Sequence, residues 1–412
     1  MKVTEIEVHE ATLEYLDWIA YPLNHYYGPI RRTFYIAHTD NGLTGLGETG
    51  TTDPQEVIDQ YIGTNPFDWI GDELSLGVGT AMYDLMGKAA GVPVYKLFGQ
   101  KHRSWVPVGS WTVSTHPDQM AEAVRQYAAM GYTWLKYHLS PFENVFDQTE
   151  AMQAVAPPGF KVHYDFTMHG TDDHMPDLLA RLAKYPLAGC FEDVLTPGDI
   201  EGYRDLRRRI DLPIVLHHMP LGGTFEVLMG AADVYMLGHS KIGAAMRKAG
   251  LFSAGNMPFM LQNVGTTITR AMTAHMMAAF PTANFHFFSD AETWQSHPVK
   301  KKLEPVNGFL RVPEEPGLGV EVDRDELERL VALELPEQPD WIVRSTYRNG
   351  TRMYTPMSTS QSLVMVRPDR GREIMLSYDA PISTDYWDED GSLEWRMMKE
   401  KLVREKVVLE RS

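Results

Sequence analysis

Eight short runs rich in apolar and β-branched residues recur between residues 106 and 290, and amphipathic segments lie between them. The runs are "VPVGSWTV", "YTWLKYHL", "FKVHYDF", "AGCFEDV", "LPIVLHHM", "DVYMLGHS", "MPFMLQN" and "NFHFFSD". Segments such as "PDQMAEAVRQYAAMG" and "MPDLLARLAKYP" separate them and have the apolar spacing of helices. Strands that alternate with helices over about 185 residues are typical of a closed parallel barrel. No glycine-rich dinucleotide turn favours the alternative, which is an open, doubly wound sheet.

The carboxyl ends of these runs carry mostly polar residues, and this is where parallel barrels place their reactive groups. In chain order the end residues are Lys136, His138, Asp165, Glu192, His218, Gly238, Gln262 and Asp290. Asp165 and Glu192 are 27 residues apart, and Glu192 and His218 are 26 apart, so they follow successive strands. Each of them alone has an ordinary alternative, such as a helix cap or a solvated turn. Together, two carboxylates and one imidazole suit a divalent cation.

Composition narrows the class of partner. The formal net charge is −17 and no basic stripe is present, so nucleic acid is disfavoured as a partner. The first residues lack the apolar core of a signal peptide, and no apolar run approaches the roughly 18 residues that span a bilayer. The single cysteine, Cys190, cannot form an internal disulfide. We expect a cytoplasmic homo-oligomer that binds a small carboxylate substrate and contacts neither nucleic acid nor membrane.

Several stretches resemble the mandelate racemase and muconate lactonizing branch of the enolase superfamily. They are "SLGVGTAMYDLMGKAAGVPVYKLFG", "GYTWLKYHL", "VHYDF", "FEDVLTPGD" and "VNGFLRVPEEPGLGVEVDRDELERL". The resemblance implies an α/β protein in which an α+β capping domain sits on a modified TIM barrel, (β/α)7β. The expected ranges are 1–105 for the capping domain, 106–305 for the barrel, 306–350 for a return segment that completes the capping domain, and 351–412 for a C-terminal extension. The tail is expected to contain extra β structure and a terminal helix.

The resemblance also implies chemistry, namely removal of a proton α to a carboxylate while Mg²⁺ stabilises the enediolate. Asp165 and Glu192 match the family's first two metal ligands, and His218 stands where the family has an acidic third ligand. Because an imidazole replaces a carboxylate there, Mn²⁺, Fe²⁺ and Zn²⁺ become alternatives to Mg²⁺. His163 is expected to share the inward face of Asp165 as an accessory ligand, and His217 is expected to face away.

His138 stands at the position of the family's base, because the chain reads Lys136-Tyr137-His138 where the family has Lys-x-Lys. Lys136, on the same side of the strand, is expected to hold the substrate carboxylate. The family's opposite-face positions hold Gly238 and Gln262, which cannot take a proton. A single base favours dehydration of a hydroxylated (sugar) acid by syn elimination. The alternatives are a racemase, epimerase or cycloisomerase of the same family, or a non-catalytic binding protein on the enzyme scaffold.

Five residues are expected to contact the substrate. His25, Tyr26 and Tyr27 belong to the aromatic loop "DWIAYPLNHYYGP", which lies where the family closes its capping domain over the site. Gln262 and Asp290 stand at strand ends. Ordinary packing of the tyrosines against the barrel rim is the alternative.

Overall fold

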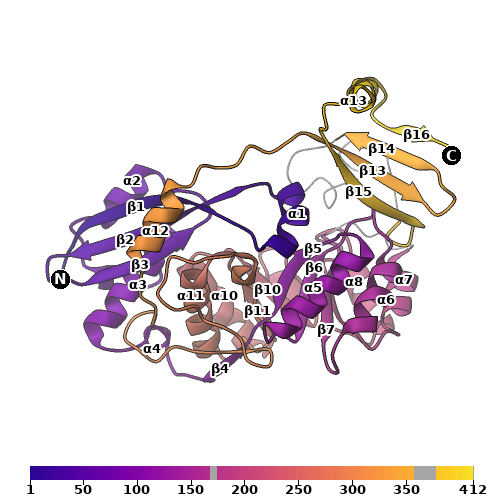
Figure 1. Ribbon diagram of the computed structural model, residues 1–412. Helices are drawn as coiled ribbons and strands as arrows, with labels where there is room; N and C mark the ends of the chain where they lie inside the picture. Colours follow the sequence, from indigo (N-terminus) through magenta and orange to yellow (C-terminus); the bar gives the residue numbers. More distant parts are fainter. Residues whose placement is uncertain (168–173, 357–376, 412) are drawn as a thin grey trace.

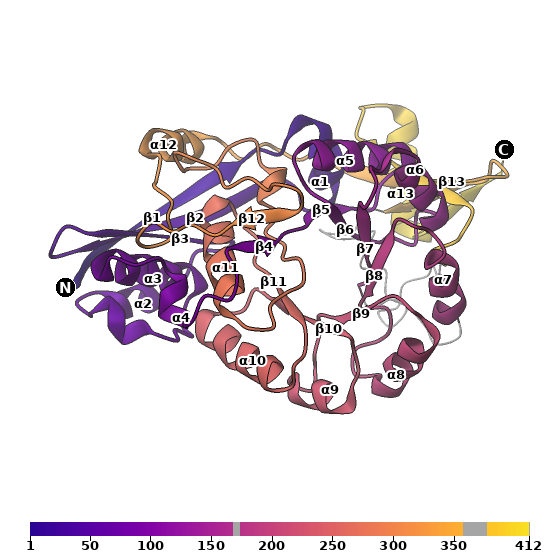
Figure 2. The ribbon, with the colours of Figure 1, turned by 90° about the horizontal axis from the view of Figure 1, so that it is seen from below.

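Seven parallel strands form the central sheet of the computed structural model, which describes residues 1–167, 174–356 and 377–411. Each strand pairs with the next along the chain. The strands are β5 (Ser110–Val113), β6 (Trp134–His138), β7 (Lys161–Asp165), β8 (Ala188–Glu192), β9 (Ile214–Leu216), β10 (Val234–Gly238) and β11 (Phe259–Gln262). Seen from below, they curve around a common centre (Figure 2).

An eighth segment closes this curved sheet. Phe287 forms a parallel bridge with Val108, and Phe288 forms one with Gln262, so the segment joins the first strand of the barrel to the last. The run "NFHFFSD" therefore takes the eighth position around the ring. This arrangement confirms the (β/α)7β barrel that the alternation of strands and helices predicted.

Helices cover the outside of the barrel (Figure 2). They are α5 (Pro117–Ala129), α6 (Val145–Val155), α7 (Met175–Leu182), α8 (Ile200–Arg209), α9 (Thr224–Met229), α10 (Ile242–Ala254) and α11 (Thr267–Ala279). α8 shows why they lie there: Ile200, Tyr203 and Leu206 recur every three residues and are buried, whereas Arg208 and Arg209 are exposed. Such a helix buries one apolar face and leaves its charged face in water.

A three-stranded antiparallel sheet lies beside the barrel (Figure 1) and contains β1 (Val3–Leu13), β2 (Ile30–Thr39) and β3 (Thr44–Thr49). α3 (Leu76–Ala90) packs on β3 so closely that a Cβ on Gly47 would lie 2.0 Å from the carbonyl oxygen of Gly77. α12 (Arg324–Ala332) returns after the barrel and packs on β1. The remaining short elements are α2 (Gln55–Ile58), η1 (Asp59–Tyr61), η2 (Pro66–Trp69), α4 (Tyr95–Phe98), the paired strands β4 (Trp105–Pro107) and β12 (Phe309–Arg311), and η3 (Ala291–Thr293).

The stretch expected as an aromatic loop is instead a helix, α1 (Asp17–Tyr26), and Pro22 lies inside it without ending it. α1 lies between the N-terminal sheet and the C-terminal strands (Figure 1). α1 contacts β5, and its Tyr26 reaches His138, the last residue of β6.

The C-terminal segment forms its own antiparallel sheet, in the order β15-β13-β14-β16, and α13 packs across it. Its elements are β13 (Trp341–Tyr347), β14 (Arg352–Pro356), β15 (Ile382–Asp388), α13 (Leu393–Glu405) and β16 (Val408–Glu410). β structure and a terminal helix are thus present in the tail, as expected. Most of the sequence that indicated the β structure, in 358–381, lies outside the described residues. β13 begins before residue 351, where the extension was expected to start, and the domain bounds stay a prediction.

Within the described ranges, no helix is both long and apolar enough to cross a membrane.

Candidate active site

β6 brings two predicted catalytic residues to the interior of the barrel. Successive side chains of a strand point to opposite faces. Lys136 and His138 both reach Asp165, at 3.0 and 3.2 Å, whereas Tyr137 points outward and donates a hydrogen bond to Gln148 of α6. The alternation expected for this strand is therefore present.

The ammonium group of Lys136 lies at the centre of a buried charged cluster. Its Nζ is 2.9 and 2.8 Å from the two carboxylate oxygens of Glu192 and 3.0 Å from Asp165 Oδ2. It also donates to Gln262 Oε1 at 2.9 Å. Lys136 has no exposed surface. Burial acts to lower the pKa of Lys136, but Asp165 and Glu192 outweigh it and the pKa is raised.

The two carboxylates are held ionised by the same contacts. Burial and the neighbouring Glu192 act to raise the pKa of Asp165, but Lys136 and His138 lower it to about 2. Burial also opposes ionisation of Glu192, yet Lys136 and His163 hold its pKa well below the usual value. The cluster therefore combines buried positive and negative charge at neutral pH, an arrangement that is typical of functional sites.

His138 has a partner on each ring nitrogen. The Tyr26 hydroxyl of α1 lies 2.7 Å from Nδ1, and Asp165 Oδ2 lies 3.2 Å from Nε2. The ring packs edge-on against Trp111, with centroids 5.2 Å apart. The side chain keeps 15% exposure, so His138 is the member of the cluster that lies nearest to solvent on β6.

The histidine pair after β9 is oriented opposite to the prediction. The strand ends before it, so strand alternation does not apply to His217 and His218. Asp193, which is buried, accepts a hydrogen bond from the His217 backbone N–H at 2.9 Å and turns the chain. His217 Nδ1 lies 3.2 Å from Glu192 Oε1. His218 Nδ1 instead bonds Asp193 Oδ2 at 2.5 Å, a contact that raises the pKa of His218, and half of that side chain is exposed.

His217 also occupies space that a side chain on the next strand would need. A Cβ on Gly238, the last residue of β10, would lie 2.1 Å from His217 Nε2. The position that resembles the family's opposite-face base is therefore filled by an imidazole that comes from the preceding strand.

The predicted substrate-binding residues divide into two groups. Tyr26 and Gln262 contact the cluster directly, through His138 and Lys136, while Tyr27 packs against the Trp111 ring at 5.6 Å. His25, by contrast, is turned away from the barrel. It lies against the C-terminal sheet, stacked on Tyr386 with ring centroids 4.2 Å apart.

Asp290 is a buried carboxyl in the left-handed backbone region, with φ of 54°. Its Oδ1 has no hydrogen-bond partner among the described residues. Burial, followed by the charge of Glu292, raises the pKa of Asp290 to about 8.

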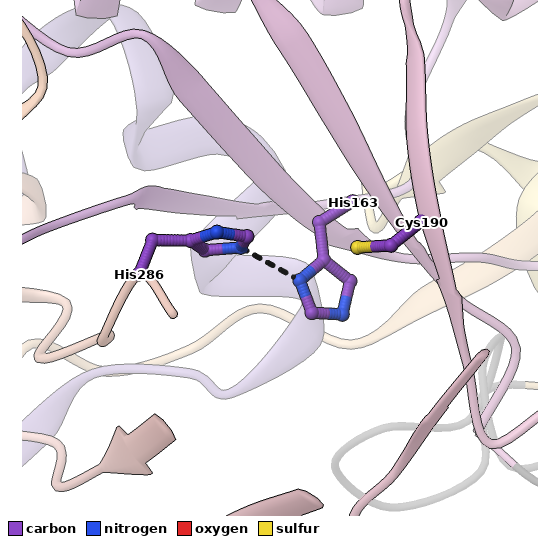
Figure 3. Close-up of side chains that lie close together, drawn as sticks. All are labelled: His163, Cys190 and His286. Carbon is purple, nitrogen blue, oxygen red and sulfur yellow. Dashed lines mark hydrogen bonds between the residues drawn. The ribbon is translucent and has the colours of Figure 1, made fainter. Parts of the chain in front are cut away.

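Sequence reasoning missed part of the layer beneath the cluster. His163 does share the inward face, and its Nε2 lies 2.6 Å from Glu192 Oε2. Its Nδ1 is hydrogen-bonded to His286 Nε2 at 2.9 Å, and Cys190 lies beside it (Figure 3). Among the described residues this trio, and the group of Asp193 with the two histidines after β9, have the ligand types and spacing to hold a metal ion. Alternation in "NFHFFSD", which puts His286 and Phe288 on one face, was the available signal.

Barrel topology and a charged cluster at the strand ends define an enzyme scaffold of the capped (β/α)7β class. A sequence profile of the family described as "Enolase C-terminal domain-like" matches residues 119–326, just over half of the chain. The chain belongs to the enolase superfamily, in its mandelate racemase/muconate lactonizing branch.

Individual relatives are distant. The chain is 28% identical over 296 residues to a D-gluconate dehydratase of Thermoproteus tenax, a match that covers 65% of this chain and 59% of that protein. An N-succinyl Arg/Lys racemase of Bacillus cereus ATCC 14579 is similar in structure, with a TM-score of 0.66, 19% identity, and coverage of 81% of this chain and 99% of that one. An enolase of Pseudomonas fluorescens Pf0-1, solved with bound magnesium, potassium and tartrate, has a TM-score of 0.67, 22% identity, and coverage of 80% and 92%. These structural likenesses describe the fold.

Proposed function

We propose that this protein removes the proton α to a carboxylate of a hydroxylated (sugar) acid and eliminates the β-hydroxyl as water. The observation that carries the proposal is the buried cluster in which Lys136 Nζ lies within 3.0 Å of both Asp165 and Glu192, with His138 beside it. Charge that develops on the enediolate needs a preorganised positive group. Two ionised carboxylates outweigh the single ammonium of Lys136, so a divalent cation bound by Asp165 and Glu192 would supply that positive charge. The dehydratase among the relatives supports this class of substrate.

His138 is the proposed base. When its Nδ1 donates to the Tyr26 oxygen, Nε2 keeps a lone pair on the side that faces the interior. Nε2 then takes the α-proton, and Asp165, 3.2 Å away, stabilises the imidazolium that forms. The imidazolium returns the proton to the departing β-hydroxyl. A 2,3-dihydroxy acid thereby loses one water and yields an enol, which becomes the 2-oxo-3-deoxy acid.

The cluster also fits a divalent cation. Asp165 and Glu192 would hold it, and two imidazoles lie near Glu192: His163 at 2.6 Å and His217 at 3.2 Å. Nitrogen donors at this position make Mn²⁺, Fe²⁺ and Zn²⁺ alternatives to Mg²⁺. Glu192 Oε2 is buried and accepts no hydrogen bond of ordinary geometry from the described residues, although Lys136 and His163 lie near it. As an ionised, buried carboxylate oxygen it is a suitable donor atom for a cation. When bound, the cation supplies Lewis-acid stabilisation of the enediolate.

A second function, epimerisation at the α-carbon, is favoured by one observation. His217 fills the space beside Gly238 and follows β9, three strands along the barrel from β6, which carries His138. Two imidazoles that lie on opposite faces of a substrate can remove a proton from one face and return one to the other. The product then differs from the substrate only in configuration, and no water is lost.

The test is a screen of sugar acids in D₂O with Mg²⁺, Mn²⁺ and Zn²⁺ in parallel. We expect a 2-oxo-3-deoxy product from at least one acid. His138→Asn should fold and bind metal as wild type does, yet turn over about 10²–10⁴-fold more slowly, which is the usual contribution of a general base. His116→Asn, at an exposed position before α5, is the matched control and should keep full activity.

Three results would redirect the assignment. Deuterium at the α-carbon with inversion and no loss of water would favour epimerisation. Unchanged α-proton exchange in His138→Asn would place the base elsewhere. Failure of every acid to exchange with the wild-type protein would favour the non-catalytic binding protein.

A further inference from the structure

The C-terminal sheet contacts the barrel immediately after the residues of the charged cluster. The Tyr378 hydroxyl donates to the carbonyl oxygen of Phe166, the residue that follows Asp165, at 2.9 Å. The Val145 N–H donates to the Tyr378 carbonyl at 2.8 Å. Tyr378 is buried. One tyrosine therefore ties the ends of the loops that follow β6 and β7 to the C-terminal segment.

The loop after β6 is held by further contacts along its length. The carboxylate of Glu143, which is 3% exposed, accepts the Thr384 N–H at 2.7 Å, and the Thr384 hydroxyl donates to the Phe142 carbonyl at 2.5 Å. Asn144 Nδ2 donates to the carbonyls of Asp379 and Ala380, both at 3.0 Å. This loop begins one residue after His138, so the sheet fixes the chain on which the proposed base is carried.

The same sheet holds α1. His25 Nε2 lies 2.6 Å from Asp388 Oδ1 at the end of β15, and the imidazole stacks almost parallel, at 3°, on Tyr386. The indole of Trp341, from β13, packs edge-on against the other part of the ring at 5.1 Å. The Tyr21 hydroxyl donates to the Tyr386 carbonyl at 3.2 Å. His25 is buried by these neighbours.

Two consecutive residues of α1 thus contact different parts of the protein. Neighbouring side chains on a helix point about 100° apart. His25 reaches the C-terminal sheet, and Tyr26 reaches His138 at 2.7 Å. A shift of α1 away from the sheet would pull the Tyr26 hydroxyl off the imidazole.

We propose that the C-terminal sheet positions the proposed base, with His25, Tyr386 and Asp388 as positioning residues that act through Tyr26. The sheet fixes α1, α1 fixes the Tyr26 hydroxyl, and that hydroxyl fixes the orientation of the His138 ring. The catalytic half of this inference rests on the proposed function; the mechanical half does not. An alignment with one similar structure includes 98% of that structure but 81% of this chain. About a fifth of this chain therefore lies outside the shared scaffold.

Hydrogen exchange measured by mass spectrometry tests the mechanical half without a substrate. Asp388→Asn removes the charge facing His25, and Tyr386→Leu removes the stacked ring. We expect amides of residues 17–27 to exchange at least tenfold faster in both variants. Asp385→Asn is the matched control, because Asp385 lies on the same strand but pairs with Arg344 inside the sheet, at 2.7 Å. Exchange in 17–27 that stays at the wild-type rate in both variants overturns the inference.

Kinetics with a substrate found in the screen tests the catalytic half. Asp388→Asn should lower kcat by roughly 10–100-fold with little change in KM, because small misplacement of a catalytic group is costly. In a His138→Asn background the same substitution should cost nothing more, since both act through one imidazole. An unchanged kcat in Asp388→Asn, or additive losses in the double variant, would refute positioning of His138. If no acid reacts, the proposed function fails while the exchange result stands.

Discussion

Replacing Lys136 with methionine is the sharpest perturbation of the cluster. The substitution keeps much of the side-chain volume and removes an ammonium that lies within 3.0 Å of Asp165 and Glu192. Both carboxylates are almost completely buried, so they would lose their counter-charge without gaining water. Removing one partner from a buried charged group typically costs about 3–5 kcal/mol of folding free energy.

The cost can be expressed as a melting temperature. Unfolding entropy of about 2.1 cal/mol/K per residue gives ~0.9 kcal/mol/K for a chain of 412 residues. Lys136→Met should therefore melt roughly 3–6 °C below wild type at pH 7.5 in the presence of a chelator. The deficit should shrink as the pH falls, because protonated carboxyls no longer need a counter-charge. Lys300→Met, in an exposed pair with Glu321, is the control and should melt as wild type does.

Divalent cations provide the second half of the assay. A cation bound between Asp165 and Glu192 would replace the missing positive charge, so Mn²⁺ should stabilise the variant more than the wild type. At a concentration 100 times the dissociation constant the gain is about 2.7 kcal/mol, or roughly 3 °C for this chain. Calorimetric melts of both proteins, with and without Mn²⁺, measure the difference. A variant that melts as wild type does without metal, or equal shifts with it, would refute the assigned role of the cluster.

Two further predictions concern Glu143, in the loop after β6, and Gly238, at the end of β10. Burial raises the pKa of Glu143 from 4.5 to about 8, so the folded protein holds a proton that the unfolded chain releases, and stability should fall as the pH rises from about 4.5 through about 8. Glu143→Gln should flatten this part of a melting-temperature profile, whereas Glu394→Gln on exposed α13 should not; equal slopes in the two variants would contradict the assignment. Gly238→Ala should push His217 aside and abolish any α-proton exchange with inversion, while Gly250→Ala, which has open space, should leave it intact. Exchange with inversion that survives in Gly238→Ala would show that His217 has no part in it.

Much of the site could be predicted from the sequence, because it depends on the order of the strands and on which face of each strand a residue occupies. Parallel pairing sets His138 opposite Asp165 and Asp165 opposite Glu192. These three residues end consecutive strands, so recognising the strands was enough to bring them together. Lys136 follows because it lies two residues before a strand end and therefore on the same face.

Other placements depend on contacts that no local pattern contains. The stretch around His25 lacks a capping residue and includes a proline, so its aromatic residues gave no helical signal. Because the stretch is helical, the side chains of His25 and Tyr26 point in different directions. The ring on which His25 stacks, Tyr386, lies more than 350 residues further along the chain. Long-range packing of this kind cannot be inferred from spacing.

The histidines after β9 show why a strand end must be considered together with its neighbours. Taken alone, Gly238 indicates that the family's opposite-face base is absent. Taken alone, His218 indicates that a histidine replaces the family's acidic third metal ligand. In space, the absence of a side chain at Gly238 and the presence of an imidazole at His217 are one feature, because the glycine leaves the volume that the imidazole fills. The prediction that His218 points inward and His217 outward was wrong for a physical reason. Asp193 accepts a hydrogen bond from the His217 backbone N–H directly after the strand ends, and His217 is then the ring that reaches Glu192. One imidazole therefore contacts Asp165 and another contacts Glu192, so stereochemistry at the α-carbon is the measurement that separates elimination with one base from proton transfer between two.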